Sequence, residues 1–239
     1  MRDRPAPRDL PVAILAGGKA TRLGDIGKSI PKALVPVAGR PFLDHQLALL
    51  KREGVHRVVI CAGHLGEQIR DHAGDGARYG LSLAYSFDGP KLLGTGGALR
   101  RALPLLGEVF FVLYGDSYLD LPLAPVVDAF VAAGKPALMT VFANHGRFDT
   151  SNVAFDGTHV RYDKRHPTPD MRYIDYGLGI LTAPVLAGYG ENEAFDLADV
   201  YAKLSAEGRL AGYEAKRRFY EIGTPASLAE ADAYLRSRR

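Results

Sequence analysis

The amino-acid sequence predicts an α/β protein with a mostly parallel central sheet flanked by helices. Three short apolar runs, residues 12–16, 57–61 and 109–113, do not alternate polar with apolar residues. A strand with one solvated face would show that alternation, so these runs indicate strands buried on both faces. Helical patterns lie between the runs, and strands that alternate with helices form βαβ units. The first 140 residues therefore predict a parallel sheet.

The elements between the buried strands follow from periodicity. Residues 42–50 carry apolar side chains near helical spacing and precede Gly54, which suits the residue just past a helix end. We expect two shorter helices at 65–73 and 97–106. Residues 81–85 alternate polar with apolar, which is typical of a strand.

The pattern changes after Phe142 to short strands separated by turns. Asp156-Gly157 lies between two β-rich segments, 152–155 and 159–162, and predicts a hairpin. We expect a further strand and two helices at 173–181, 197–204 and 226–235. The last third of the chain thus predicts a smaller, strand-rich lobe. We expect a single domain over 11–235, between a flexible, charged N-terminal tail (1–10) and a short C-terminal tail (236–239).

Composition excludes several classes of protein. The chain has 239 residues, of which 47% are hydrophobic, so disorder is not expected. A single cysteine, Cys61, excludes an intramolecular disulfide framework and a Cys-rich zinc site, and its apolar run indicates a small buried residue. No apolar stretch approaches the roughly 18 residues of a membrane span, and the run at 12–16 is too short for a signal peptide. We therefore expect a cytoplasmic protein.

The positive charge of the chain lies in its two ends and in one internal loop. The formal net charge is +3, and residues 17–32 alone contribute +3, from four basic residues against Asp25. No basic stripe interleaved with aromatic residues is present, so we expect no nucleic-acid partner.

The basic loop follows the first predicted strand. Ligands of α/β folds bind at the carboxyl ends of parallel strands, where glycines such as Gly17 and Gly18 let backbone amides approach a phosphate. Arg22 adds a forked donor and Lys32 a point charge. The alternative is a flexible, solvated loop. Two common phosphate motifs do not fit: residues 22–29 lack the first P-loop glycine, and residues 94–99 end in Leu99 where a dinucleotide motif has glycine.

Several motifs in order resemble the sugar-1-phosphate nucleotidyltransferase family. The first is LAGGKATRL at 15–23, followed by PKALVPV at 31–37 and GRP at 39–41. Further matches are LGTGGA at 93–98, YGD at 114–116, DK at 163–164 and EIGTP at 221–225. The chain is most similar to short bacterial members without a C-terminal β-helix, the heptose-1-phosphate guanylyltransferases and N-acetylmuramate-1-phosphate uridylyltransferases. The resemblance implies a Rossmann-like, GT-A-like fold, with a nucleotide-binding part at about 11–142 and a sugar-binding lobe at about 143–225.

The resemblance also implies a reaction. A nucleoside monophosphate passes from an NTP to a sugar 1-phosphate, giving an NDP-sugar and pyrophosphate. GTP is the first expectation, with a heptose or hexose 1-phosphate as acceptor, and UTP is the second. The attacking phosphate oxygen is largely deprotonated at neutral pH, so no general base is required. A nucleotide-sensing homologue without activity is the alternative, and the oligomeric state is left open, a homodimer included.

Site residues follow from the same resemblance. Arg22 and Lys32 are the expected catalytic residues, on the β/γ and α phosphates respectively. The expected nucleotide contacts are Leu15, Ala16, Gly17, Gly18, Lys19, Thr21, Arg22, Lys32, Gly94, Thr95, Gly96, Gly97 and Asp116. Mg²⁺ is expected on Asp116 and Glu221, because this hard cation prefers oxygen ligands. The sugar phosphate is expected on Lys164, Asp163, Asn152 and Asp175.

Other interpretations of these motifs stay open. Asp116, taken alone, suits a turn or a helix cap, and Asp163-Lys164 suits a solvated turn. The glycines at 94–97 suit close approach of a nucleobase, or the start of a helix capped by Thr95. Three positions depart from the family pattern: Ala20 replaces Gly, Asp163 replaces Glu, and Glu221 replaces Asp.

Overall fold

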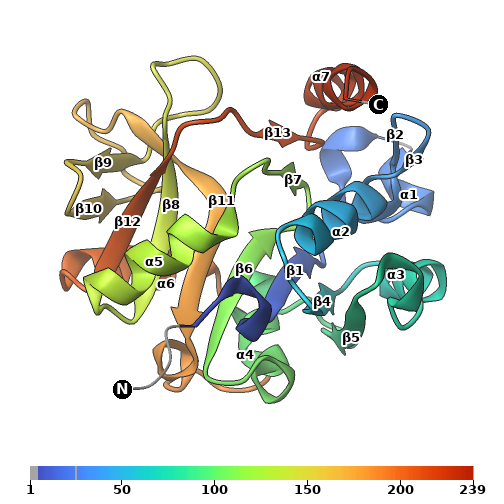
Figure 1. The fold of residues 1–239 in the computed structure, drawn as a ribbon, viewed down its shortest axis with the longest axis horizontal. Helices are drawn as coiled ribbons and strands as arrows, with labels where there is room; N and C mark the ends of the chain where they lie inside the picture. The colour runs from blue at the N-terminus through green and yellow to red at the C-terminus, as the bar shows by residue number, and fades with distance from the viewer. Residues whose placement is uncertain (1–4, 25, 239) are drawn as a thin grey trace.

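The computed structural model describes residues 5–24 and 26–238, and it confirms the α/β class (Figure 1). Within these residues, nine strands form one sheet. Its first half is parallel: β5 (Ser82–Phe87) pairs with β4 (Arg57–Ala62), β4 with β1 (Val12–Ala16), and β1 with β6 (Val109–Tyr114).

The second half continues the same sheet. β11 (Tyr173–Thr182) runs antiparallel to both β6 and β8 (Ala137–Ala143), and β12 (Leu210–Ala215) is parallel to β8. The predicted hairpin is present as β9 (Val153–Phe155) and β10 (Val160–Tyr162), which pair antiparallel. The strand-rich lobe is therefore an extension of the sheet through β11.

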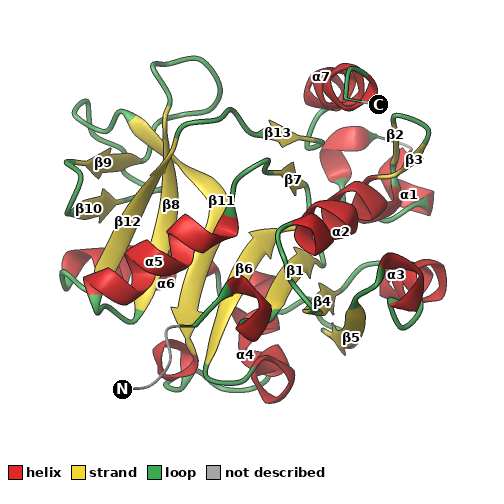
Figure 2. Cartoon of the chain, viewed as in Figure 1, coloured by secondary structure: helices red, strands yellow, loops and turns green. Residues whose placement is uncertain are grey.

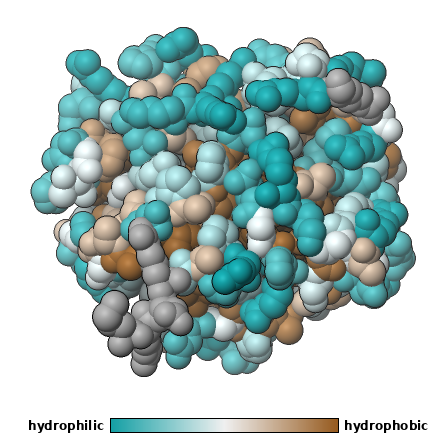
Figure 3. All heavy atoms as spheres, in the orientation of Figure 1, coloured by the Kyte–Doolittle hydropathy of each residue, from teal (hydrophilic) through white to brown (hydrophobic). Residues whose placement is uncertain are grey.

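Helices cover both faces of the sheet (Figure 2). On one face, α2 (Phe42–Arg52), α3 (Gly66–Ala73) and α5 (Leu123–Ala133) share a core with Val12 and Ile14 of β1. On the other, α4 (Gly94–Leu106) and α6 (Leu197–Ala206) share a core with Ala13. Successive β1 side chains thus enter opposite cores, which is why the run is apolar throughout. Hydrophilic residues cover much of the face in Figure 3.

Short elements surround the carboxyl edge of the parallel strands. These are η2 (Thr21–Leu23), α1 (Ile26–Ser29), η3 (Lys32–Leu34), β2 (Pro36–Val37), β3 (Arg40–Pro41), β7 (Ser117–Tyr118) and β13 (Tyr220–Glu221). The last helix, α7 (Pro225–Arg236), packs on a third apolar cluster with Val37 and Phe42. Three more 3₁₀ turns are η1 (Pro7–Asp9), η4 (Ala77–Tyr79) and η5 (Ala183–Leu186). No helix of the described residues is both long and apolar enough to cross a membrane.

The structure corrects several predicted boundaries. The tail expected at 1–10 is not free in its described part, because η1 forms at its end and Leu10 is buried. Likewise, the Arg238 guanidinium lies 3.5 Å from Asp120 and over the Tyr234 ring, so the C-terminal tail contacts the fold. Residues 1–4 and 239 lie outside the described residues. α4 begins at Gly94, three residues before its predicted start, and α5, β8 and β12 have no predicted counterpart.

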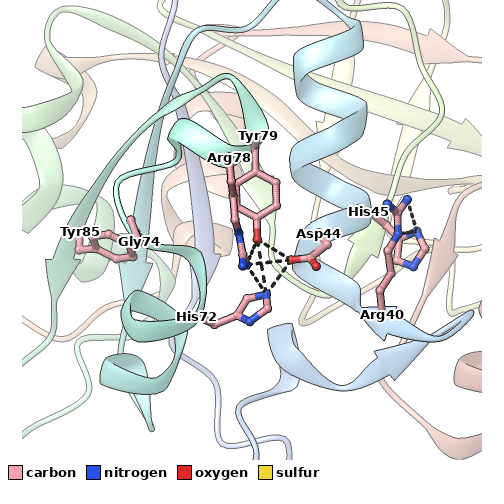
Figure 4. A network of polar contacts seen from close by, with 8 residues as sticks. All are labelled: Arg40, Asp44, His45, His72, Gly74, Arg78, Tyr79 and Tyr85. Atoms are coloured by element: carbon pink, nitrogen blue, oxygen red, sulfur yellow. Dashed lines mark hydrogen bonds and ion pairs between the residues drawn. The ribbon is translucent and has the colours of Figure 1, made fainter.

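A polar cluster joins α2 to α3 and η4 away from the carboxyl edge (Figure 4). The Asp44 carboxylate accepts a hydrogen bond from the Tyr79 hydroxyl at 2.7 Å and lies 2.8 Å from Nε2 of His72. Arg78 contacts both His72 and Tyr79. These contacts hold helices that pack on the parallel strands, so we assign this cluster a structural role.

Candidate functional site

A cavity of about 260 Å³ lies at the carboxyl ends of β1, β4 and β6. This is where parallel α/β sheets bind ligands. Its walls come from the basic loop, from the ends of the three strands and from the start of α4. The lining residues are Leu15, Ala16, Gly17, Gly18, Lys32, Ala33, Cys61, Asp88, Leu92, Gly94, Thr95, Ala98, Tyr114, Gly115 and Asp116.

A second, larger cavity of about 950 Å³ opens beside the first, between β11, β13 and the start of α7. Arg22, Asn152, Lys164, Asp175 and Glu221 all line it. Tyr114 and Asp116 line both cavities, so the two spaces adjoin at the turn after β6. The arrangement can hold two ligands whose reacting ends meet at Asp116.

Lys32 and Asp116 meet at this boundary. The Nζ of Lys32 lies 3.1 Å from Oδ2 of Asp116, and the side chains are 19% and 27% exposed. η3 positions the lysine, and the turn between β6 and β7 positions the aspartate. Both side chains keep access to the cavities while they contact each other.

Glu221 approaches Asp116 through the short β7–β13 ladder. Glu221 pairs with Ser117, and the backbone amide of Ile222 donates to the Asp116 carbonyl at 3.0 Å. Burial raises the pKa of Glu221, and the Asp116 charge raises it further, while Arg22 and Lys32 oppose the shift. The two carboxylates therefore face a common space, with Lys32 and Arg22 beside them.

This pair of carboxylates fits a magnesium ion. The donor set is oxygen only, and Mg²⁺ is usually held by one or two carboxylates together with substrate phosphates. Among the described residues, no group of three or more His, Cys, Asp or Glu side chains could hold a metal by itself. The residues present thus suit a metal that arrives with a phosphate ligand.

The basic loop divides between the cavities. Gly17 and Gly18 line the first, whereas Arg22 of η2 lines the second. A Cβ on Gly223 would lie 3.1 Å from the Arg22 guanidinium, so this glycine leaves room for it. Lys19 and Thr21 are exposed and, in the described structure, line neither cavity.

Ala20 and Gly27 lie against each other at the base of the loop. Ala20 adopts a left-handed φ of 52°, which glycine would adopt more easily, and its methyl group is buried. A Cβ on Gly27 would lie 2.4 Å from the Ala20 carbonyl oxygen. Gly27 of the P-loop-like sequence is therefore required by packing against Ala20.

Asp175 lies in the second cavity within a hydrogen-bonded cluster. Its carboxylate accepts from the Gly177 amide at 2.9 Å and from the Tyr114 hydroxyl at 3.3 Å. Its backbone amide donates to the Asn152 side chain at 3.3 Å. Burial raises the pKa of Asp175 to about 6, although these hydrogen bonds and the Lys164 charge oppose the shift.

Asp163 does not join this cluster. Its carboxylate accepts hydrogen bonds from the backbone amides of Arg165 and His166, at 2.9 and 2.8 Å, and these bonds lower its pKa. It is absent from the described walls of both cavities, while its neighbour Lys164 lines the second. Asp163 therefore caps a turn in this structure, and its expected contact with the sugar stays a prediction.

The glycines at 94–97 serve packing more than ligand approach. Gly94 and Thr95 line the first cavity, but Gly96 and Gly97 are buried and, in the described structure, line neither. Their amides donate to the Phe195 carbonyl at 3.0 and 3.3 Å, and a Cβ on Gly96 would lie 2.3 Å from the Phe195 ring. These two glycines let the segment before α6 lie against the start of α4.

Thr95 also differs from its expected capping role. Its hydroxyl accepts from the Leu197 amide at 2.8 Å and contacts the Asp196 carboxylate. Asp196 is the N-cap residue of α6. Thr95 therefore supports the start of α6 and does not cap its own helix.

Asp88 is a cavity residue that no sequence motif indicated. It follows β5 directly, is 6% exposed and lines the first cavity. One carboxylate oxygen accepts from the Leu93 amide at 3.1 Å, and burial raises its pKa. Its position just past the carboxyl end of a parallel strand is the signal that could have identified it.

Comparisons with known proteins identify relatives of this chain. A family model described as "Nucleotidyl transferase" matches residues 12–152. The chain is 30% identical to an N-acetylmuramate alpha-1-phosphate uridylyltransferase of Neisseria meningitidis, over 92% of this chain and 96% of that one. It is 28% identical to a D-glycero-alpha-D-manno-heptose 1-phosphate guanylyltransferase of Campylobacter jejuni, over 89% and 94%.

Of two further matches, one covers only part of the relative and the other has low sequence identity. A UTP–glucose-1-phosphate uridylyltransferase of Synechocystis is 36% identical over 48% of this chain, which spans only 32% of that protein. The solved structure of an inositol-1-phosphate CTP transferase from T. maritima superposes with a TM-score of 0.76 and 20% identity, over 98% and 97% of the two chains. At that identity, the superposition supports the fold alone.

Proposed function

This chain belongs to the nucleotidyl transferase family, and from that premise we propose that it transfers a nucleoside monophosphate from an NTP to a sugar 1-phosphate. The observation that carries the proposal is the meeting of two cavities at Asp116, beside Lys32 and Glu221. One cavity takes the nucleotide base, the other takes the sugar, and the phosphates meet between them.

In this reaction an oxygen of the sugar 1-phosphate attacks the α-phosphorus of the NTP. The new P–O bond forms as the bond to the bridging oxygen breaks, and pyrophosphate leaves. Lys32 supports negative charge on the α-phosphate, and Arg22 holds the β and γ phosphates. Lys164 neutralises the sugar phosphate, and Asn152 and Asp175 orient the sugar. Asp116 and Glu221 would hold a magnesium ion, which would supply neutralisation of phosphate charge.

Asp88 supports GTP as the preferred nucleotide. A carboxylate only accepts hydrogen bonds, and guanine presents adjacent N–H donors on N1 and N2. Uracil presents a single N–H between two carbonyl oxygens, which a carboxylate repels. A heptose or hexose 1-phosphate is the acceptor that we propose with GTP. UTP stays the second candidate because a relative of similar length is named as a uridylyltransferase. We place the reaction in the cytoplasm, as a source of NDP-sugars for cell-envelope polysaccharide.

The decisive experiment is a crossed panel of NTPs and sugar 1-phosphates with Mg²⁺, followed by pyrophosphate release. We expect turnover with GTP and at least one sugar 1-phosphate. Nucleotide binding without turnover for every pair would contradict the proposal and identify the chain as a nucleotide sensor.

Substitution of Asp88 by asparagine tests the choice of base. Asparagine offers one donor and one acceptor, so it suits uracil and removes one acceptor for guanine. We expect the ratio of kcat/KM for GTP over UTP to fall at least about tenfold. Asp71→Asn, an exposed position on α3, is the matched control. An unchanged ratio in Asp88→Asn would exclude Asp88 from base recognition.

A further inference from the structure

Gln46 of α2 is a buried polar residue that makes no contact with either cavity in the described structure. Its side-chain amide donates to the Ser117 carbonyl at 2.8 Å and to the Tyr114 carbonyl at 3.1 Å. These two carbonyls lie on either side of Gly115 and Asp116. We propose that Gln46 is a positioning residue that sets the separation of the Asp116 and Glu221 carboxylates. This inference rests on the proposed function, which assigns a metal to that pair.

The contacts of Gln46 reach both carboxylates through the backbone. Ser117, which accepts from Gln46, is the residue that pairs with Glu221 in the β7–β13 ladder. The Asp116 carbonyl, between the two anchored carbonyls, accepts from the Ile222 amide. A shift of the turn after β6 would therefore change the positions of Asp116 and Glu221 together.

The carboxylate pair requires such an anchor. Two like charges that face a common space repel each other, and the ladder that joins them has only two residues in each strand. α2, by contrast, is an eleven-residue helix whose Leu43, Leu47 and Leu50 are buried in the main core. Gln46 thus ties a weak ladder to a rigid element.

The chemistry of Gln46 argues against a packing role alone. Its Oε1 has no hydrogen-bond partner within the described structure. A buried unpaired acceptor lowers stability, so an apolar residue of similar size would serve packing better. Carbonyl oxygens accept hydrogen bonds, and only the nitrogen of the Gln46 side-chain amide can donate them. The two carbonyls therefore define the orientation of this amide group.

The test measures binding of Mn²⁺ by EPR to the full chain saturated with GTP, without sugar 1-phosphate, because Mn²⁺ replaces Mg²⁺ on oxygen ligands. Gln46→Met keeps the length of the side chain and removes both donors. We expect about tenfold weaker Mn²⁺ binding, in the range found for residues that orient metal ligands. The Mg²⁺ concentration for half-maximal activity should rise by a similar factor, while nucleotide affinity in EDTA stays within twofold.

Thr140→Val is the matched control. Thr140 is fully buried and donates to the Leu178 carbonyl between β8 and β11, away from the two cavities. It should lower the thermal unfolding midpoint as Gln46→Met does and leave Mn²⁺ affinity within twofold. Gln46→His keeps one N–H donor and should lose less Mn²⁺ affinity than Gln46→Met. If the methionine variant does not fold, the histidine variant tests the inference in its place.

Unchanged Mn²⁺ affinity in the folded Gln46 variants would overturn the inference and leave the proposed function standing. An equal loss in Thr140→Val would also overturn it, because general destabilisation would then account for the effect. A GTP-saturated wild-type chain that holds no Mn²⁺ beyond the Mn²⁺–GTP complex in solution would overturn the metal site itself, and with it this inference.

Discussion

Lys32 is the cation closest to the meeting point of the two cavities. Its ammonium group contacts Asp116, and the residue lines the first cavity. We therefore expect Lys32→Ala to lower kcat by at least about 100-fold, the usual effect of removing one electrostatic stabiliser. Pre-steady-state and steady-state assays of pyrophosphate release will measure the effect.

The control for Lys32 is Lys203→Ala, on the exposed side of α6. It removes the same charge from the surface and should leave kcat within twofold. Near-normal kcat in Lys32→Ala would remove this lysine from the mechanism.

Ionisation of the Asp175 carboxyl group should make the stability of the protein depend on pH. Burial raises its pKa from 3.8 to about 6, so the folded state favours the neutral carboxyl group. Between pH 4 and 6 the unfolded chain ionises this group first, and stability falls as pH rises through that window. The full loss, about 2–3 kcal/mol, is present above pH 6. Asp175→Asn removes this contribution.

Denaturant unfolding at several pH values will measure the Asp175 effect. The stability of Asp175→Asn relative to wild type should increase from pH 4 to pH 6 and then stay constant. Parallel curves for the two proteins would show that Asp175 ionises normally.

Among individual residues, sequence motifs identified Arg22, Lys32, Asp116, Lys164 and Glu221 as cavity residues. They did not identify Asp88 or Gln46, nor the charged residues Arg147, Asp149, Arg218 and Glu230 that also line the second cavity. Arg22, Lys32, Asp116 and Glu221 belong to long motifs with characteristic spacing. Asp88 and Gln46 act through three-dimensional neighbours on other elements. The sequence around Asp88 or Gln46 contains no motif that indicates those neighbours.

At the scale of elements, the start of α4 shows how one motif can serve packing. Gly96 lies in a helix, where alanine normally stabilises by up to about 1 kcal/mol. Here the new Cβ would lie 2.3 Å from the Phe195 ring. We expect Gly96→Ala to destabilise the protein by about 2 kcal/mol, because overpacking forces the α6 segment away from α4.

Gly188 is the matched glycine for this experiment. A Cβ there would meet nothing within 4 Å, and its φ is not in the left-handed region. Gly188→Ala should therefore change the free energy of unfolding by less than about 0.5 kcal/mol. Equal effects of the two substitutions would contradict the packing explanation for Gly96.

Three strands buried on both faces were predicted, whereas β8, which also contributes to both cores, was not. The apolar runs at β1, β4 and β6 report burial directly, and the hairpin follows from its Asp-Gly turn. The sequence did not predict the start of α4. The hydrogen-bond acceptor for its first backbone amides is the Phe195 carbonyl, which comes from a distant segment of the chain. The two-residue strands β7 and β13 are too short to show any period, yet they hold the carboxylate pair.

At the scale of the molecule, Asp120 joins three distant parts of the chain. Its side chain is 8% exposed and contacts Arg52 at the end of α2, Arg217 before β13, and Arg238 after α7. Burial alone would raise the pKa of Asp120, but the hydrogen bond from Arg52 and the three positive charges lower it. This cluster connects the C-terminus to the turn that carries Asp116.

We expect Asp120→Asn to lower the free energy of unfolding by about 1–2 kcal/mol at pH 7, because it removes the one carboxylate that contacts Arg217, Arg238 and Arg52, although these arginines are partly exposed and Arg52 keeps Glu53. The lowered pKa means that the wild-type advantage exists above pH 3.8 and is lost as pH falls below that value. Chemical unfolding at pH 7 and pH 3 will measure it. A difference as large at pH 3 as at pH 7 would assign the effect to packing.

The sequence by itself determined the α/β pattern, the buried strands and the charged groups of the site, because burial and chemical type are properties of each residue and its near neighbours. The tertiary structure decided which of those groups face a common space. It placed Glu221 beside Asp116 across about a hundred residues, removed Asp163, Gly96 and Gly97 from the cavity walls, and added Asp88. These outcomes depend on contacts between distant segments, and local periodicity carries no record of such contacts.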